Sequence, residues 1–477
     1  MRPIMRLRHL GAATAVIFSA AACNSMLDVK PVAELPRDQA LTGPTSARAA
    51  VAGMYDALLD NEGGNYYSGN LVFFTDVSSD DVDWTGTFTS FADAQDNNLR
   101  ADNGDVAGMW NAAYRTVARA NLVLAQLPSI AGIPAGEKNA YLGEAHFVRA
   151  LAYHDLVKLW GGQNPGDPGV PLILAPVEDP TSSTSLTRAT TGAVYTQILA
   201  DLTQAEALIP ASQTDPTRAT RGAAIALRAR VELFRKNYAA AESLSTVVEN
   251  MGYDLTPNYA DLFTAEGQIT SEDIFTLTFS AVDFGEEGYY YLGRTEVEPS
   301  EALAQAYQPS YVPGKLSTWN PTDIRAQVNI FADVNNEICG GLCGTKYPTT
   351  VGAEDIHIIR FAEILLTRAE ARARQGGATK LAGAVADVNR IRKRAGLDTL
   401  VFGVDLTTQQ QVIDEVMLQR RLELAMEGFR WSDLVRTGLV QNWLTAQGAP
   451  SYQALYPIPR RELAVSPNIA QNPGYTR

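Results

Sequence analysis

The sequence predicts a mostly α-helical protein in which degenerate tetratricopeptide-like helix pairs form a scaffold that carries long irregular loops with a few short strands. Apolar residues recur at spacings of three and four in both halves of the chain, as they do along one face of an α-helix. The helical stretches come in pairs joined by short turns, and such pairs bury one face only by stacking on their neighbours. The strict period of about 34 residues typical of these repeats is absent, so the repeats are degenerate.

The first 22 residues have the pattern of a signal peptide. Three arginines within the first eight positions precede the uncharged apolar run 10–22, which ends in small residues before Cys23. This run is shorter than the ~20 residues that a helix needs to cross a membrane. No later stretch is both longer and uniformly apolar, so no mature transmembrane span is expected.

The segment after that run predicts a lipid anchor. Ala20-Ala21-Ala22-Cys23 resembles a bacterial lipobox, in which the cysteine thiol is lipidated and becomes the new N-terminus. Two or more acyl chains hold a protein stably on a membrane. Simple secretion with cleavage after Ala22 is the alternative. Residues 23–40 contain two prolines and few apolar side chains, and we expect them to tether a single domain that spans 41–477.

Composition and charge exclude some classes of protein. Of the 477 residues, 46% are hydrophobic and 19% are charged, which is typical of a soluble globular chain rather than a disordered one. The net charge of −14 becomes more negative once the basic leader is removed. Because a nucleic-acid binder needs a positive footprint, no nucleic-acid partner is expected.

The first part of the helical scaffold is expected over about 41–250. Pro210 should end one of its helices because proline cannot continue a helix. Lys236-Asn237 should form the turn between the last two helices. The helices themselves are expected at 144–160, 195–208, 223–234 and 238–248.

The second part of the scaffold is expected over about 352–440. Its first apolar stripe begins at Phe361, and Gly376-Gly377 separates it from the next stripe. Thr407 is placed to cap a third helix, because Gln410 follows at the spacing of a capping box and Gly428 lies near the end of that helix.

Between the two parts, about 251–351 is expected to be a loop-rich, ligand-binding insertion. It contains short apolar runs such as 274–279, many turn residues and no sustained helical period. The stretches 68–96 and 161–187 share that character. Long loops on a rigid scaffold are typical of binding proteins.

Cys339 and Cys343 are predicted to form a disulfide. Lipidation of Cys23 leaves this even pair in an exported, oxidising compartment. So small a loop constrains the unfolded chain little and would mainly shape local structure. A metal site needs more ligands than this pair offers nearby, so neither a metal nor another cofactor is expected.

Sequence signs of catalysis are scarce. The chain has no H-E-x-x-H, Walker or G-x-S-x-G motif. His146 and His154 lie about 80° apart round a helix and are interpreted as partly packed surface histidines. His357 stands alone. Two further pairs, Arg420 with Glu423 and Arg430 with Asp433, have the three-residue spacing of ion pairs on a helix surface.

Clustered carboxylates leave two alternatives open. Asp80, Asp81 and Asp83 lie beside Trp84, and Glu286-Glu287 precede a run of tyrosines. Two carboxylates are the usual machinery of glycosidases, and a loop-bound calcium at Asp81 and Asp83 is a further reading. Acids clustered in polar loops are usually solvated, so no catalytic residue and no enzymatic activity are predicted.

Aromatic residues outside the helical stripes are the main candidates for ligand contacts. Sugar rings present C–H faces that stack on indole and phenol planes, so glycan sites combine flat aromatics with a few hydrogen-bonding side chains. We expect such a face on the first loop and the middle segment. The candidate residues are Trp84, Phe88, Asp81, Tyr289, Tyr290, Tyr291 and Trp319.

Several blocks, in order along the chain, together resemble the SusD/RagB family. In the first half, an arginine-alanine-aromatic helix over 144–160 runs into Gly161-Gly162 and then Val170-Pro171-Leu172, after a helix that contains Trp110. The blocks of the second half are Ile359–Ala371, Val388–Leu397, Arg420–Leu434, Tyr456–Pro459 and Gln471–Tyr475.

The resemblance implies a SusD-like helical fold, attachment to the outer membrane facing outward, and docking on a SusC-like TonB-dependent barrel. Family members capture glycans or other oligomeric nutrients for that barrel, so an oligosaccharide or another oligomeric nutrient is the expected ligand. The helical repeats are also compatible with a second function, a lipoprotein scaffold that binds a protein or peptide. A surface hydrolase is a third possible function. A SusC-like gene beside this one would favour uptake.

Overall fold

The computed structural model describes residues 41–60, 63–177, 185–265, 267–280, 282 and 284–476. The predicted signal peptide, the tether and the lipidation residue Cys23 lie outside the described residues. Within them the protein is mostly α-helical with a few short strands, as predicted. None of the helices in the described part of the chain combines the length and the apolar character needed to span a membrane.

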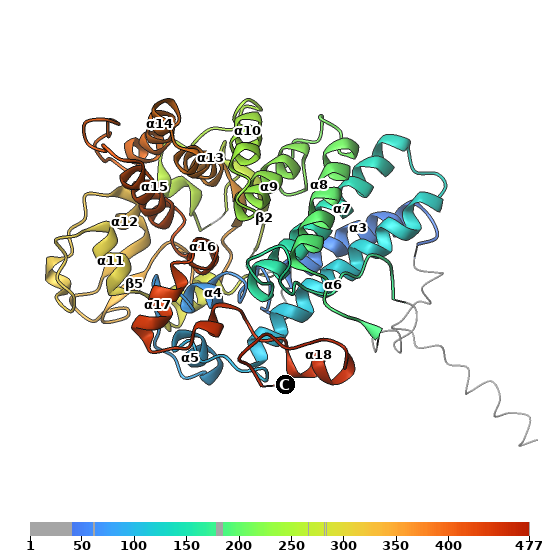
Figure 1. The fold of residues 1–477 in the computed structure, drawn as a ribbon, viewed down its shortest axis with the longest axis horizontal. Helices are drawn as coiled ribbons and strands as arrows, with labels where there is room; N and C mark the ends of the chain where they lie inside the picture. The colour runs from blue at the N-terminus through green and yellow to red at the C-terminus, as the bar shows by residue number, and fades with distance from the viewer. Residues whose placement is uncertain are drawn as a thin grey trace, which may run out of the picture.

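The first part of the scaffold is a row of helices in which each packs against the next (Figure 1). Side-chain caps start two of them, because Thr190 accepts the backbone N–H of Ala193 and Thr220 accepts that of Ala223. The turn between the last two helices contains Lys236 with φ 61°. The helices are α3 (Pro44–Leu59), α6 (Gly104–Gln126), α7 (Ala135–Trp160), α8 (Thr191–Leu208), α9 (Arg221–Phe234) and α10 (Tyr238–Glu249).

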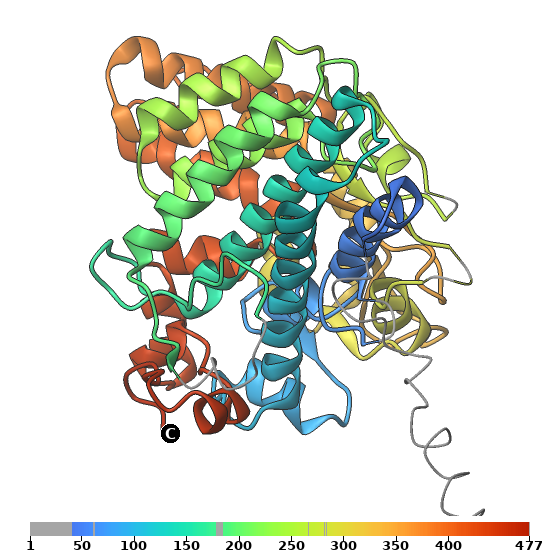
Figure 2. The same ribbon diagram turned by 90° about the vertical axis from the view of Figure 1, so that its right-hand side faces the viewer.

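The second part continues the same array because α10 packs against α13 (Figure 2). The predicted break at Gly376-Gly377 separates α13 from α14, and both glycines have the positive φ that a side chain disfavours. The capping box is one residue later than predicted, with Thr408 and Gln411 as its members. The helices are α13 (Phe361–Gln375), α14 (Ala378–Arg394), α15 (Gln409–Glu423), α16 (Arg430–Thr437), α17 (Val440–Gln447) and α18 (Arg460–Val465).

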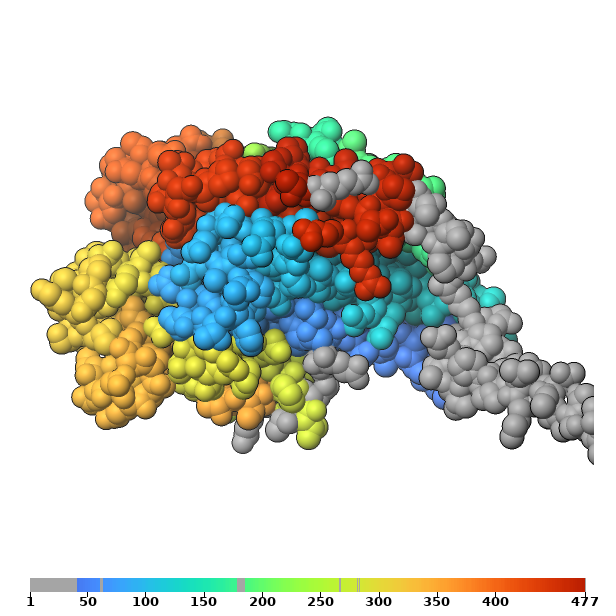
Figure 3. Space-filling view, turned by 90° about the horizontal axis from the view of Figure 1, so that it is seen from below, coloured from blue at the N-terminus to red at the C-terminus, as the bar shows by residue number. Residues whose placement is uncertain are grey.

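Three antiparallel strand pairs fasten the loops to one another and to the scaffold. β1 (Val82–Trp84) pairs with β3 (Val297–Pro299), β2 (Asp273–Leu277) with β6 (Ile356–Arg360), and β4 (Ile330–Ala332) with β5 (Leu342–Gly344). Seen from below, the blue residues around α5 lie beside the yellow-green residues of the middle segment (Figure 3). The short helices among the loops are α4 (Phe73–Val77), α5 (Thr89–Gln95), α11 (Glu301–Tyr307), α12 (Ile324–Asn329) and the π-helical turn η4 (Tyr289–Gly293).

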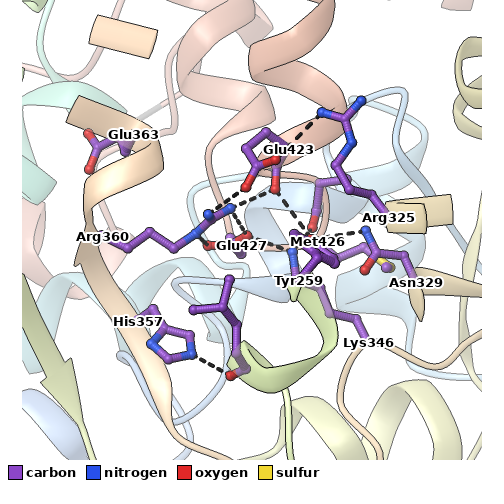
Figure 4. A network of polar contacts seen from close by, with 12 residues as sticks. Tyr259, Arg325, Asn329, Lys346, His357, Arg360, Glu363, Glu423, Met426 and Glu427 are labelled. Carbon is purple, nitrogen blue, oxygen red and sulfur yellow. Dashed lines mark hydrogen bonds and ion pairs between the residues drawn. The ribbon is translucent and has the colours of Figure 1, made fainter. Parts of the chain in front are cut away.

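A buried ionic network joins the middle segment to the second part of the scaffold (Figure 4). Arg360, at the end of β6, donates hydrogen bonds to Glu272 and Glu423 at 2.6 Å each and to both oxygens of Glu427 at 2.8 Å. Arg325 on α12 also approaches Glu423, and Lys346 donates to Glu427 at 2.6 Å. Acids and bases from four distant segments therefore neutralise one another inside the protein.

This network corrects the predicted surface ion pairs. Arg420 is buried and donates to Asp433 at 2.7 Å across the loop after α15, whereas Glu423 pairs with Arg360. Arg430 pairs with Asp80 on the first loop at 2.6 Å. The three-residue spacing was misleading, because α15 packs against α13 and α11, which buries Arg420 and Glu423.

The prediction that His146 and His154 are both partly packed surface residues was correct for His146 and wrong for His154. His146 is partly exposed and bonds Asp201 at 2.7 Å. His154 is fully buried against Phe234, and burial lowers its pKa well below the usual value. The long helix α7 is covered on nearly all sides by its neighbours, which is why an apparent polar face lies in the core.

Candidate functional site

Strands β1 and β3 bring the first loop and the middle segment together. Trp84 lies opposite Val297, and Asp83 lies opposite Glu298. The pairing extends one residue further, because the backbone N–H of Thr85 donates to the carbonyl of Glu296 at 2.9 Å. Side chains of both segments therefore share one surface next to α5 and η4.

Four aromatic rings form a continuous stack at this junction, in the order Phe88, Trp84, Phe91 and Phe73. The planes of neighbouring rings differ by 18°, 23° and 7°, and their centroids are 6.1, 4.6 and 5.5 Å apart. Tyr290 packs at a tilt against the three inner rings. Trp84 is only 7% exposed whereas Phe88 is 43% exposed, so the stack rises from the core and ends in an open ring.

A cation lies beside the exposed end of this stack. The guanidinium of Arg294 is 5.5 Å from the ring centroid of Phe88 and 5.9 Å from that of Tyr289. Its Nε donates to Glu296 at 2.6 Å, which neutralises the charge. The arrangement fixes two outward-facing rings and one ion pair as a small platform, which we call the Phe88 platform.

A second aromatic group lines an open groove of about 480 Å³ between η5 (Leu316–Thr318) and strand β4. Trp319 and Phe331 are among its walls, and Tyr311 packs edge-on against Trp319 with centroids 5.6 Å apart. Phe331 lies directly opposite Cys343 across the β4–β5 pair. We call this feature the Trp319 groove. It is open and apolar enough to hold a flat ligand face.

The disulfide loop connects strand β5 to strand β4, which forms one wall of that groove. Cys339 and Cys343 are bonded, with Cα atoms 5.8 Å apart. Asp333 accepts backbone N–H bonds from four consecutive residues, Glu337 to Gly340, and these bonds lower its pKa to about 2. Asp333 and the two cysteines lie close enough to suggest a metal, yet the bonded sulfurs and the occupied carboxylate do not fit one.

Three carboxylates occupy the strip between the Phe88 platform and the Trp319 groove. Asp83 and Glu298 face each other across β1 and β3, and β3 in turn contacts β5. Glu301, at the start of α11, accepts the backbone N–H of Gly314 at 3.1 Å. Burial raises the pKa of Asp83 and of Glu298, and the charge of Glu301 raises the first while that of Asp83 raises the second.

The structure brings together only some of the residues singled out from the sequence. Trp84, Phe88, Tyr289 and Tyr290 form one group, as expected of a shared face. Trp319 belongs to a different hydrophobic cluster, so the first group and the groove are separate features.

Three candidates, Tyr291, Asp81 and Trp84, are buried, which corrects the expected exposed face. Tyr291 is 1% exposed and packs against Tyr347, because η4 turns its ring into the core. Asp81 is fully buried and receives a hydrogen bond from Arg421 at 2.6 Å. The same bond leaves Asp81 unsuited to the calcium reading. Trp84 is also mostly covered, so only its edge is available at the surface.

Sequence reasoning missed several members of the site. Phe91 extends the ring stack, and its signal was the spacing of aromatics at 84, 88 and 91. Arg294 and Phe331 carried no local signal, because their roles depend on rings and strands that are distant in sequence. The facing pair of Asp83 and Glu298 likewise appears only when β1 and β3 are paired.

Comparison with protein families gives two matches that cover different parts of the chain. A family described as "Starch-binding associating with outer membrane" matches residues 25–233, and the SusD family matches residues 343–454. A SusD-like protein of Formosa agariphila is 26% identical over 508 aligned positions, which cover 95% of this chain and 96% of that protein. The starch-binding protein SusD of Bacteroides thetaiotaomicron is 39% identical over 139 positions, covering 27% of this chain and 22% of that protein.

Solved structures share the fold. A laminarin-binding SusD-like protein aligns with a TM-score of 0.75 at 24% identity and covers 91% of this chain and all of its own. A SusD superfamily protein of Bacteroides thetaiotaomicron aligns with a TM-score of 0.76 at 24% identity, covering 90% of this chain and 99% of its own. At such identities the likeness establishes the helical architecture and not the ligand.

Proposed function

This chain belongs to the SusD/RagB family, and we propose on that basis that it binds oligomeric nutrients, in particular glycans, and delivers them to a SusC-like TonB-dependent transporter. Two similar proteins are named as starch-binding and laminarin-binding, which supports a glycan as the ligand class. The helical array serves as the rigid scaffold, and the loops that it carries provide the binding surface.

One observation carries the glycan proposal. The ring stack rises from the core and ends in the exposed rings of Phe88 and Tyr289, which the Arg294–Glu296 pair holds in place. An exposed aromatic ring offers a flat face, and the C–H face of a sugar can stack on it. The carboxylates beside it can accept hydrogen bonds from sugar hydroxyls.

The proposed location is the outer surface of the outer membrane. The lipobox-like segment before Cys23 supports a lipid anchor, and the matched family is described as associating with that membrane. Cys23→Ala is expected to move the full-length protein from the detergent phase to the aqueous phase in a Triton X-114 partition. A variant that stays in the detergent phase would show that Cys23 is not the anchor.

We propose binding without hydrolysis. Two of the acids that suggested a glycosidase are held by arginines, since Asp80 receives two hydrogen bonds from Arg430 and Asp81 one from Arg421. Glu287 is 1% exposed and cannot reach a substrate in solution. Overnight incubation with a bound oligosaccharide should leave its length unchanged by mass spectrometry, and shortened products would contradict this part of the proposal.

The binding proposal is tested by isothermal titration of the mature protein with a panel of oligosaccharides that includes laminarihexaose and maltohexaose. Release to a transporter favours moderate affinity, and a dissociation constant near 1 μM corresponds to about −8 kcal/mol. Phe88→Ala and Trp319→Ala each remove an exposed stacking surface, and losing a true anchor costs on the order of 1–3 kcal/mol. Binding should therefore weaken about tenfold in at least one variant.

The control is Phe402→Ala, which removes a partly buried ring from the hydrophobic cluster beneath α14 and α15, outside both aromatic groups. It should bind like the wild type. Normal affinity in both Phe88→Ala and Trp319→Ala would place the site elsewhere. The delivery step is tested separately by co-purification with the neighbouring SusC-like barrel, if its gene adjoins this one, and failure to co-purify would leave only the binding role.

A further inference from the structure

The strip between the two aromatic groups carries an unbalanced negative charge. Asp83 and Glu298 are directly opposite each other in the β1–β3 register, where like charges on one face are destabilising. In the described part of the chain, no lysine or arginine makes an ion pair with these two residues or with Glu301, whereas Glu296 is paired with Arg294. The protein thus holds three carboxylates together without a basic partner.

Local geometry fixes these carboxylates in the path between the rings. An added Cβ on Gly341, in the disulfide loop, would lie 2.9 Å from Glu298 Oε2, so Glu298 reaches from β3 to the wall beside the Trp319 groove. Glu301 lies on the other side, where Tyr311 packs on Trp319. These contacts place the strip next to the Trp319 groove through Tyr311, and next to the Phe88 platform through Glu296, which lies two residues before Glu298.

Resting on the proposed glycan-binding function, we propose that the site selects uncharged oligosaccharides and rejects anionic ones such as uronate or sulfated glycans. Neutral sugar hydroxyls can donate to Asp83 and Glu298, which offsets the repulsion between them. A glycan carboxylate or sulfate would add a further negative charge at short range. Arg294 would neutralise little of this added charge, because its guanidinium already pairs with Glu296 and packs against two aromatic rings.

The test compares a neutral hexasaccharide, laminarihexaose or maltohexaose, with hexagalacturonate by isothermal titration of the mature protein. We expect hexagalacturonate to bind at least tenfold more weakly in 0.1 M NaCl, a difference of about 1.4 kcal/mol. Raising NaCl to 1 M shortens the screening length from about 10 Å to about 3 Å, so hexagalacturonate binding should strengthen while neutral binding stays constant.

The double variant Asp83→Asn/Glu298→Gln keeps the size of both side chains and removes the repulsion between them. It should melt no lower than the wild type and bind hexagalacturonate at least fivefold more tightly. Asp254→Asn, an exposed acid on the loop after α10, is the matched control and should leave both affinities unchanged.

The outcomes separate this inference from the proposed function. Equal affinity for the two glycans in the wild type, preference for hexagalacturonate, or an unchanged hexagalacturonate affinity in the double variant would overturn the charge selection alone. Absence of binding to every oligosaccharide of the panel would refute the glycan-binding function itself, and the inference would fall with it.

Discussion

Arg360 offers the sharpest test of how the middle segment is held on the scaffold (Figure 4). Its guanidinium is 1% exposed and contacts three carboxylates, those of Glu272, Glu423 and Glu427, which are themselves almost fully buried. The substitution Arg360→Met keeps the apolar length of the side chain and removes the charge. Arg394 and Lys346 still reach these acids, so the network loses one of its cations and keeps all of its anions.

The expected loss of unfolding free energy in Arg360→Met follows from the burial of its ion pairs. Removing one partner of a buried ion pair costs about 3–5 kcal/mol, because the other charge stays buried without compensation. Since folded domains are stable by only about 5–15 kcal/mol, this is a large fraction of the total. The measurement is urea unfolding at pH 7.5, followed by circular dichroism and by tryptophan fluorescence.

An exposed pair provides the control. Arg48 donates to Glu137 at 2.8 Å but has 56% of its side chain exposed, so Arg48→Met should leave the free energy of unfolding nearly unchanged. The loss caused by Arg360→Met should also shrink on acidification, because protonation of Glu427 and its neighbours relieves the buried charge. A loss below about 1 kcal/mol at pH 7.5, or one that does not depend on pH, would refute the view that this network fastens the segment.

Three further predictions concern titration and packing. Burial lowers the pKa of His357, but the charge and hydrogen bond of Asp273 outweigh burial and raise it above its usual 6.5. Its stabilising contribution is therefore complete below about pH 6.5 and is lost as pH rises through the folded pKa, and thermal melts of His357→Gln should lack the wild-type decline above pH 6.5. Burial and nearby acids raise the pKa of Glu286 to about 7 from 4.5, so the folded state loses stability as pH rises between these values, and Glu286→Gln should raise the melting temperature at pH 8 but not at pH 4. Trp84→Ala should cost about 3–5 kcal/mol in urea unfolding because Trp84 packs against Phe91 in the core, and a variant that weakens ligand binding without loss of stability would show that Trp84 acts as an exposed contact.

The structure also explains why some candidate residues can contact a ligand at the surface and others cannot. Their residue type was a sound guide to chemistry, but exposure depends on what packs over each side chain. Phe88 caps a helix and faces out, whereas Trp84, four residues earlier, is covered by Phe91 and Tyr290. Phe91 lies close enough in sequence for its spacing to signal it, but the covering ring of Tyr290 could not be assigned to Trp84 from its neighbours in sequence.

By itself the sequence determined the helical scaffold, its turns and the pairing of the two nearby cysteines. The apolar periodicity of a helix is visible over a few turns of sequence. Gly376-Gly377 ends a helix because glycine readily adopts a positive φ. Neither feature depends on residues that are distant in sequence. The blocks that resemble the SusD/RagB family lie mostly on these helices, which is why the family was recognisable.

Only the tertiary structure decided which charges and rings meet. Arg430 finds Asp80 at a separation of 350 residues, and Arg360 gathers acids from segments on both sides of it. Asp83 meets Glu298 only because β1 pairs with β3 in one register, and a shift by one residue would turn the two carboxylates to opposite faces. Burial in a dry interior decides whether such groups become pairs that hold the fold or a surface that selects a ligand, and burial is a property of the whole packed chain.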